Sequence, residues 1–187
     1  MKPTQTIRSQ RNCRGMTLVE VLVAAFVIAT GLMGVAALQV TALQGASNAD
    51  YRSRATDLAA SLADRMRANL PAVDDYASAT AADCDTIPAP VCAMTLDPNS
   101  STTVASCSTQ QMAIFDLWEV RCRNGVQTSL PGGQMTVACI DNDTTDEDSC
   151  SELSPLRVTI TWRLQGDDDA TATEQVVTTV IPGAPWK

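Results

Sequence analysis

The sequence predicts a protein of the α+β class, with one long N-terminal helix, disulfide-bonded loops and a C-terminal antiparallel sheet. No proline interrupts the chain between Met16 and Leu70, where helix-forming residues dominate. Two runs rich in Thr, Val and Ile, 156–164 and 173–181, are joined by a turn containing Gly and three Asp and predict a hairpin. Cysteines are spread through the region between the helix and the hairpin.

The first 15 residues form a basic leader ahead of an apolar segment. The leader has no acidic residue and four basic ones, Lys2, Arg8, Arg11 and Arg14. From Val21 to Ala49 no residue carries a formal charge, which makes the apolar run too long for the core of a cleaved secretory signal. Glu20 also disagrees with such a signal, because a charge inside an inserted helix costs roughly 2.5–3.5 kcal/mol. We therefore expect Glu20 to have a partner.

The predicted helix changes character along its length. Residues 16–43 are apolar on all sides, which suits a bilayer or a filament core. Residues 44–70 are amphipathic and should lie against a globular head formed by residues 71–187. The alternative is a membrane helix followed by a separate amphipathic helix. The apolar stripe of the second half consists of Tyr51, Ala55, Leu58, Leu62, Met66 and Leu70.

Two pairs of opposite charges support helix in the second half. Asp50 and Arg54 are spaced i,i+4, and Asp64 and Arg67 are spaced i,i+3, so each pair can meet on the exposed side. Pro71 is expected to stop the helix.

The region from 74 to 153 is rich in Ser, Thr, Asp and Pro. We expect little apolar core in it, with disulfides stabilising the loops instead. Within it, Met112–Cys122 is predicted to be a short helix or strand. Met135–Ile140 is predicted to be a strand, introduced by a Pro-Gly-Gly turn.

Of the seven cysteines, Cys13 lies in the leader. The other six can pair completely as three disulfides in a head outside the cytoplasm, and the sequence leaves the pairing open. A zinc site is disfavoured, because the cysteines lack the short C-x2–4-C spacing of such sites. The six are Cys84, Cys92, Cys107, Cys122, Cys139 and Cys150.

Composition excludes several functions. The net charge of −8 disfavours nucleic-acid binding, since phosphates would be repelled. The absence of histidine removes the usual general base, and no nucleophile or phosphate-loop motif is present, so we predict neither an enzyme nor a cofactor. One acidic run is a weak calcium candidate that lacks the Gly and Glu of an EF-hand; its alternative is a solvated loop. The candidate ligands are Asp141, Asp143, Asp146 and Asp148.

The string Gly15-Met16-Thr17-Leu18-Val19-Glu20, behind its basic leader, resembles the class III signal of type IV pilins and pseudopilins. The resemblance implies that a prepilin peptidase cuts between Gly15 and Met16 and that the new amine of Met16 is methylated. Glu20 then occupies the acidic fifth position of the mature family. One departure is Met16, where the family most often has Phe. The alternative to cleavage is an uncleaved signal anchor.

The resemblance also implies a role for Glu20. In this family the acid is thought to pair with the α-amine of a neighbouring subunit, which couples docking to register. In this chain that amine belongs to Met16. The alternative is a Glu20 side chain that extends toward lipid headgroups.

A narrower resemblance links the chain to PilV-type minor pilins, the type IV pilus modification proteins. It rests on Ala36–Gln39, Ala59–Asn69 and Leu156–Trp162. It implies the type IV pilin fold, in which a long helix packs on an antiparallel sheet. It also implies assembly with other minor pilins and the major pilin, and a role in initiating the pilus near its tip. Before assembly the protein would cross the inner membrane once, with its head in the periplasm, and it would then reach the pilus surface.

Two further functions stay open at this point. A tip-exposed adhesive module would be expected to expose aromatic side chains, and a minor pseudopilin of type II secretion would share the architecture. The aromatic residues available outside the helix are Tyr76, Phe115, Trp118, Trp162 and Trp186.

Overall fold

The computed structural model consists of two units, the first ending at Leu43 and the second beginning at Gln44. The residues that the structure describes are 15–78, 84–93, 105–123, 125–143, 145, 150–151, 154–166, 172–181 and 183.

Helix α1 (Leu18–Ala68) confirms the prediction of one long, uninterrupted N-terminal helix. It ends before Pro71, where the amide of Asn69 still donates to the carbonyls of Arg65 and Met66. A 3-10 turn, η1 (Leu70–Ala72), and the short helix α2 (Asp75–Ser78) follow. Pro71 therefore lies in the first turn of η1, where its missing N–H costs no helical hydrogen bond.

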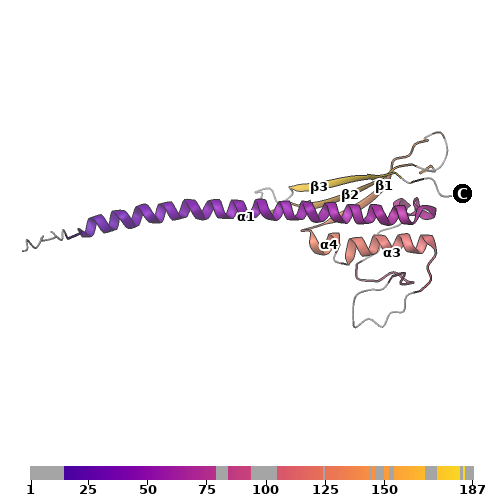
Figure 1. Ribbon diagram of the computed structural model, residues 1–187, viewed down its shortest axis with the longest axis horizontal. Coiled ribbons are helices and arrows are strands. Elements are labelled where there is room, and N and C mark those ends of the chain that lie inside the picture. Colours follow the sequence, from indigo (N-terminus) through magenta and orange to yellow (C-terminus); the bar gives the residue numbers. More distant parts are fainter. Residues whose placement is uncertain are drawn as a thin grey trace, which may run out of the picture. The chain divides into compact units, whose positions relative to one another are not determined.

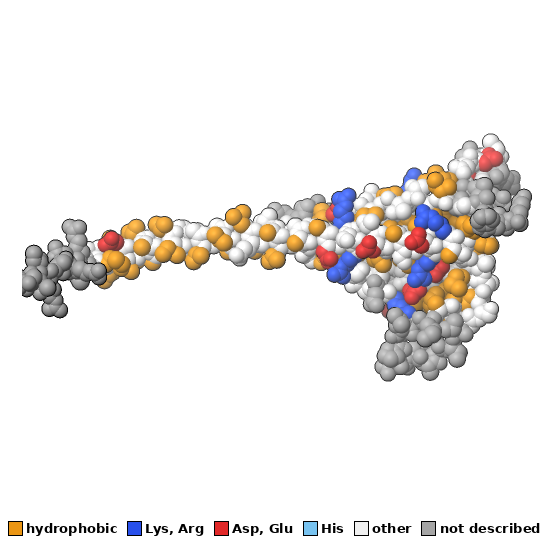
Figure 2. Space-filling view, viewed as in Figure 1, with side chains coloured by type: hydrophobic (Ala, Val, Ile, Leu, Met, Phe, Trp, Pro, Cys, Tyr) orange, Lys and Arg blue, Asp and Glu red, His pale blue; other side chains and the backbone are white. Residues whose placement is uncertain are grey.

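The first unit contains an apolar part of α1 whose described side chains are all exposed. An 18-residue window of α1 has a mean hydropathy of 2.5, and by length and composition α1 could cross a membrane. Its hydroxyls are satisfied within the helix, since Thr30 donates to the carbonyls of Phe26 and Val27, and Thr41 to that of Ala37. This segment therefore presents little unsatisfied polar surface to an apolar environment. Figure 2 shows hydrophobic side chains along this part of the helix and charged ones gathered over the second unit.

The second unit contains a three-stranded antiparallel sheet in the order β1-β2-β3. Its strands are β1 (Gln134–Cys139), β2 (Leu156–Arg163) and β3 (Thr173–Val180). The predicted hairpin is confirmed, with Leu156 opposite Val180 and Arg163 opposite Thr173. Residues of β2 alternate between the core and the outside, as expected for a sheet covered on one face.

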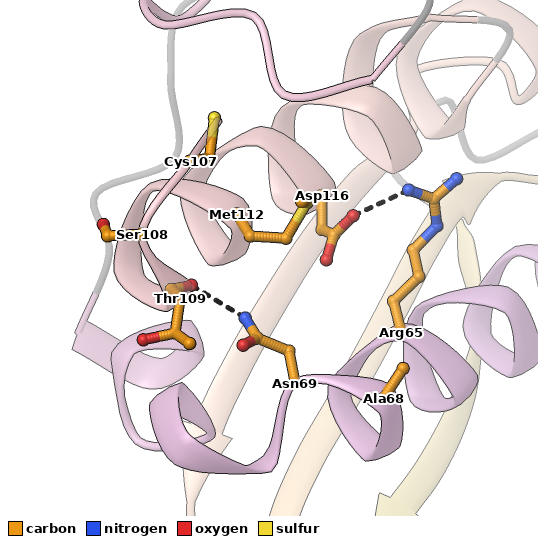
Figure 3. Close-up of a pocket in the computed structure, with 8 residues that line it drawn as sticks. All are labelled: Arg65, Ala68, Asn69, Cys107, Ser108, Thr109, Met112 and Asp116. Atoms are coloured by element: carbon orange, nitrogen blue, oxygen red, sulfur yellow. Dashed lines mark hydrogen bonds and ion pairs between the residues drawn. The ribbon is translucent and has the colours of Figure 1, made fainter. Parts of the chain in front are cut away.

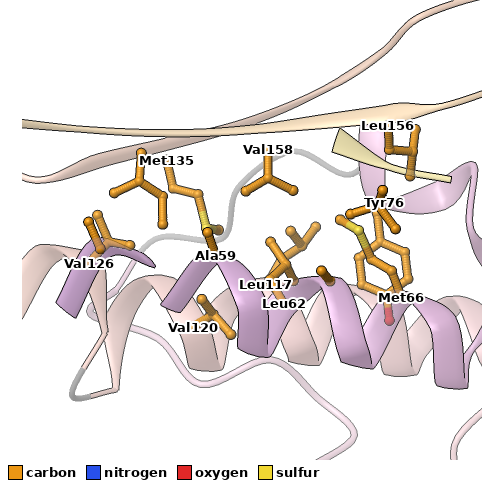
Figure 4. Packing of buried hydrophobic residues seen from close by; sticks show 14 of the residues in the cluster. Ala59, Leu62, Met66, Tyr76, Leu117, Val120, Val126, Met135, Leu156 and Val158 are labelled. Carbon is orange, nitrogen blue, oxygen red and sulfur yellow. The ribbon is translucent and has the colours of Figure 1, made fainter. Parts of the chain in front are cut away.

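The core lies where α1 meets the sheet and α3 (Thr109–Cys122). In Figure 1 the sheet lies on one side of this part of α1, and α3 and α4 (Val126–Ser129) lie on the other. Small buried residues, Ala55, Ala59 and Ala63, allow close approach to α1. Figure 4 shows Leu62 and Met66 of α1 among Leu117, Val158 and the ring of Tyr76.

Helix α3 settles the choice between helix and strand for residues 112–122. It begins with a capping box, in which Ser108 accepts from the amide of Gln111 and the Gln111 side chain accepts from the amide of Ser108. Ala113, Leu117 and Val120 face the main core. A second face of α3, with Phe115, Trp118 and Cys122, packs into a smaller cluster with Cys92.

The expectation of little apolar core between residues 74 and 153 was wrong. This region supplies much of the buried apolar surface, because α3 is buried on two faces. Apolar residues on both faces of α3, between polar loops, leave no clear helical periodicity in the sequence. The buried residues it contributes are Tyr76, Cys92, Ala113, Phe115, Leu117, Trp118, Val120, Cys122, Val126, Leu130 and Met135.

The prediction of three disulfides is confirmed, and the structure gives the pairing. The bonds are Cys84–Cys122, Cys92–Cys107 and Cys139–Cys150. The first two tie the loops at residues 84–93 and 105–108 to α3 and to each other. The third joins the end of β1 to the chain that leads toward β2.

Candidate functional site

The Gly15–Met16 peptide lies just outside α1, which begins at Leu18. The side chain of Met16 is 71% exposed, and a Cβ added to Gly15 would have no atom within 4 Å. Among the described residues, nothing covers this peptide bond. The leader residues 1–14, including Cys13, lie outside the described part of the chain.

Glu20 lies in the first turn of α1. Its amide donates to the carbonyl of Thr17 at 3.1 Å and to Thr17 Oγ1 at 3.4 Å, so Thr17 caps the start of the helix. A carboxylate in the first turn also interacts favourably with the positive end of the helix dipole. Glu20 is the single charged residue in the sequence from Gly15 to Leu43. Its carboxylate can therefore find a cationic partner only outside this segment or at a newly formed α-amine.

A polar cluster in the head joins α1 to α3. Arg65 donates to Asp116 at 2.7 Å and to Glu119 at 2.8 Å. The hydroxyl of Tyr76 donates to the other oxygen of Asp116 at 2.7 Å. Asn69 donates to the carbonyl of Thr109 at 2.8 Å, so the end of α1 is also tied to the start of α3.

Burial and hydrogen bonding shift the pKa values in this cluster. Burial lowers the pKa of Arg65, but the hydrogen bonds to Asp116 and Glu119 outweigh it and the net pKa is raised. Burial raises the pKa of Tyr76, and its hydrogen bond to Asp116 raises it further. Asp116 is 5% exposed, and each of its two carboxylate oxygens accepts a hydrogen bond, one from Arg65 and one from Tyr76. The cluster is a satisfied joint between two helices, without a nucleophile paired to a base.

A pocket of about 350 Å³ lies beside this joint. Figure 3 shows Arg65 and Asn69 on one side of it and Met112 and Asp116 on the other. The guanidinium of Arg65 already bonds to Asp116, and the side-chain amide of Asn69 already bonds to the Thr109 carbonyl, so these groups are engaged within the protein. Sequence reasoning missed the cluster because Arg65 and Asp116 are 51 residues apart and no local spacing relates them.

The described part of the acidic run uses its carboxylates to shape a loop. Asp141 accepts from the hydroxyl and amide of Ser151 and from the hydroxyl of Ser154, and these bonds lower its pKa. The pKa of Asp143 is lowered by hydrogen bonds from the hydroxyl and amide of Thr145. The other two calcium candidates, Asp146 and Asp148, lie outside the described residues. Calcium binding stays a prediction.

Two family models match the chain. The prokaryotic N-terminal methylation motif matches residues 10–36, and the model for type IV pilin Tt1218 matches residues 37–118. The two matches adjoin and cover the region from the leader to the middle of α3. No curated protein and no solved structure matches the chain.

Proposed function

Because the chain belongs to the type IV pilin family, we propose that it is a minor pilin that enters a type IV pilus through its N-terminal helix and helps to initiate assembly near the tip. The family is structural, and its methylation motif implies processing by a prepilin peptidase and assembly with other pilins. The resemblance of three sequence segments to PilV-type minor pilins supports the minor role. The other minor pilins and the major pilin would be its partners.

One observation carries the proposal: the exposed, apolar segment from Gly15 to Leu43 has a single charged side chain, that of Glu20. An apolar helix of this length is suited to a bilayer before assembly and to burial among other helices afterwards. Its side chains make no core of their own in the described chain. The segment therefore requires an apolar environment supplied by lipid or by other subunits.

Glu20 would fix how far the apolar helix of one subunit is shifted along the helix of its neighbour. A carboxylate surrounded by hydrocarbon is stabilised by a neighbouring cation or by protonation. Cleavage after Gly15 creates a cation at Met16, close to the start of α1. We infer that the Met16 amine of one subunit pairs with Glu20 of another, as the resemblance to type IV pilins implies.

The same features suggest an orientation. The basic leader would stay on the cytoplasmic side, in line with the excess of Lys and Arg found there in membrane proteins. The head would lie in the periplasm, an oxidising compartment in which its three disulfides persist. The protein would then move to the pilus surface.

Initiation is favoured over adhesion by the burial of the aromatic side chains. Tyr76, Phe115, Trp118 and Trp162 are each at most 6% exposed, and Trp186 lies outside the described residues. Binding surfaces generally use exposed Tyr and Trp as anchors. The described head offers none of these four residues to a receptor.

Counting surface pili tests the proposal. In a strain that cannot retract its pili, deletion of the gene should reduce pilus number, and the wild-type gene should restore it. Glu20→Ala should fail to restore pilus number although the chain is still processed. Asp57→Ala, which removes an exposed carboxylate from the head part of α1, should restore it.

Normal pilus number in the deletion strain would contradict a role in initiation. Normal pili with lost surface attachment would favour the adhesive module, and normal pili with lost protein secretion would favour a type II secretion pseudopilin.

A further inference from the structure

Strand β1 is an open edge of the sheet. The amide of Ile140 donates to the carbonyl of Pro155, and the register then directs the amides of alternate residues toward β2. Met135, Val137 and Cys139 consequently direct their N–H and C=O groups away from the sheet. Within the described chain these groups have no backbone partner. The strand also contains no proline or charged residue of the kind that protects sheet edges from pairing.

A hollow of about 520 Å³ lies beside the first half of this edge. Arg121, Gln127 and Gly132 line it together with Gln134 and Thr136. A second hollow of about 350 Å³ shares Gly132 and Gln134 and is lined also by Arg163 and Thr161. The Arg163 head group lies over Gly132, since a Cβ added to that glycine would be 2.5 Å from Arg163 Nε.

The two hollows carry positive charge that the described chain does not neutralise. No acidic side chain is among the described residues that line either hollow. Among the described residues Arg121 and Arg163 form no ion pair, and Arg121 Nε is buried without a hydrogen-bond partner. Five other described arginines of this unit are paired with carboxylates, and exposed Arg157 has no ion pair among the described residues. The paired ones are Arg52, Arg54, Arg65, Arg67 and Arg123. In a chain of net charge −8, two unpaired arginines beside an open strand edge favour an acidic ligand.

We propose that β1 binds an extended acidic segment of a partner protein, which adds a fourth strand to the sheet and places carboxylates near Arg121 and Arg163. The open N–H and C=O groups of Met135, Val137 and Cys139 supply the backbone pairing, and the arginines select acidic side chains. A free anion would use the arginines alone and leave the strand edge unpaired. The site lies in the head, so it does not depend on the role proposed for Glu20.

A fluorescent peptide of alternating Thr and Glu, about eight residues long, tests strand addition to the full chain in detergent micelles. Fluorescence anisotropy measures its affinity. Two further peptides carry N-methyl groups, one on the Thr amides and one on the Glu amides. Only one set of alternate amides faces the edge of a neighbouring strand. We therefore expect one N-methylated peptide to bind about tenfold more weakly or worse, and the other to bind like the parent.

Protein variants test the charge selection. Arg121→Gln and Arg163→Gln should each weaken binding of the parent peptide several-fold. Arg157→Gln should not, because this exposed arginine lies on the same sheet but lines neither hollow. Circular dichroism checks that each variant is folded, and Arg163→Gln alone suffices if Arg121→Gln does not fold. Hydrogen exchange at Met135, Val137 and Cys139 should slow when the peptide binds.

Three results would overturn the proposal. These are absence of binding, equal affinity of both N-methylated peptides and the parent, and equal binding of a Thr–Gln peptide. The second would mean that the arginines bind anionic groups without strand pairing.

Discussion

At the scale of single residues, Tyr76 shows how a polar contact holds the short helix α2 against α3. Its hydroxyl donates to the buried carboxylate of Asp116, and hydrogen bonds to charged groups stabilise by about 1.5–3 kcal/mol. We expect Tyr76→Phe to lower the free energy of unfolding by about this amount. Tyr51→Phe is a matched control that removes an exposed hydrogen bond from Gln165 and should cost less than about 1 kcal/mol.

Urea unfolding with the disulfides intact measures both variants. If Tyr76→Phe and Tyr51→Phe lowered the free energy of unfolding equally, the buried hydrogen bond to Asp116 would stabilise the fold no more than the exposed one does.

The raised pKa of Tyr76 predicts a dependence of stability on pH. The folded state holds the phenolic proton more tightly than the unfolded state, so the unfolded chain loses its proton first as the pH rises. The contribution is complete below the unfolded-state pKa of about 10 and is lost above it. Between about pH 9 and pH 11, the free energy of unfolding should fall more steeply for the wild type than for Tyr76→Phe. If the free energy of unfolding fell with pH equally steeply for both proteins, the raised pKa of Tyr76 would be contradicted.

Which residue contacts could be predicted depended on their separation in the sequence. The ion pairs Arg54–Asp50 and Arg67–Asp64 were expected from helical spacing, and both form. The contact between Arg65 and Asp116 was not expected, because it depends on how α3 packs against α1. The spacing of residues in a helix predicts which side chains meet within that helix, but it does not predict contacts between two different helices.

At the scale of elements, periodicity located the buried face of α1 only in part. Ala55, Leu62 and Met66 are fully buried, as the apolar stripe predicted. Ala59 and Ala63 widen that face, because α1 is covered by both the sheet and α3. The hairpin was predictable from its Thr, Val and Ile content. The core contribution of α3 was not, since burial on two faces removes the contrast between apolar and polar sides.

The disulfides differ in the length of chain that they close. Cys84–Cys122 spans a separation of 38 residues and Cys139–Cys150 a separation of 11. In the chain-entropy model, replacing the first pair by alanines should cost about 1 kcal/mol more than replacing the second. Burial acts in the same direction, because Cys122 is buried while Cys139 and Cys150 are half-buried. Urea unfolding of the two double variants measures the difference, and the reverse order would contradict the model.

At the scale of the whole molecule, the chain divides its functions between its two units. Residues 15–43 of the first unit present an apolar surface with the single charge of Glu20, as the proposed docking segment requires. The second unit is a folded head with its own core, three disulfides and an open strand edge. The sequence alone indicated the role of the apolar segment, because the features that define it follow one another along the chain. The edge at β1 became visible only when strand order placed it beside Arg121 and Arg163.

The central claim is that the chain is processed at Gly15 and incorporated into pili. Intact-mass analysis of protein from pili sheared off a peptidase-competent strain tests it most directly. We predict a chain of residues 16–187 with one methyl group on the amine of Met16. Recovery of the full-length chain in the membrane alone, or of a chain cut between Val21 and Ala49, would contradict the claim.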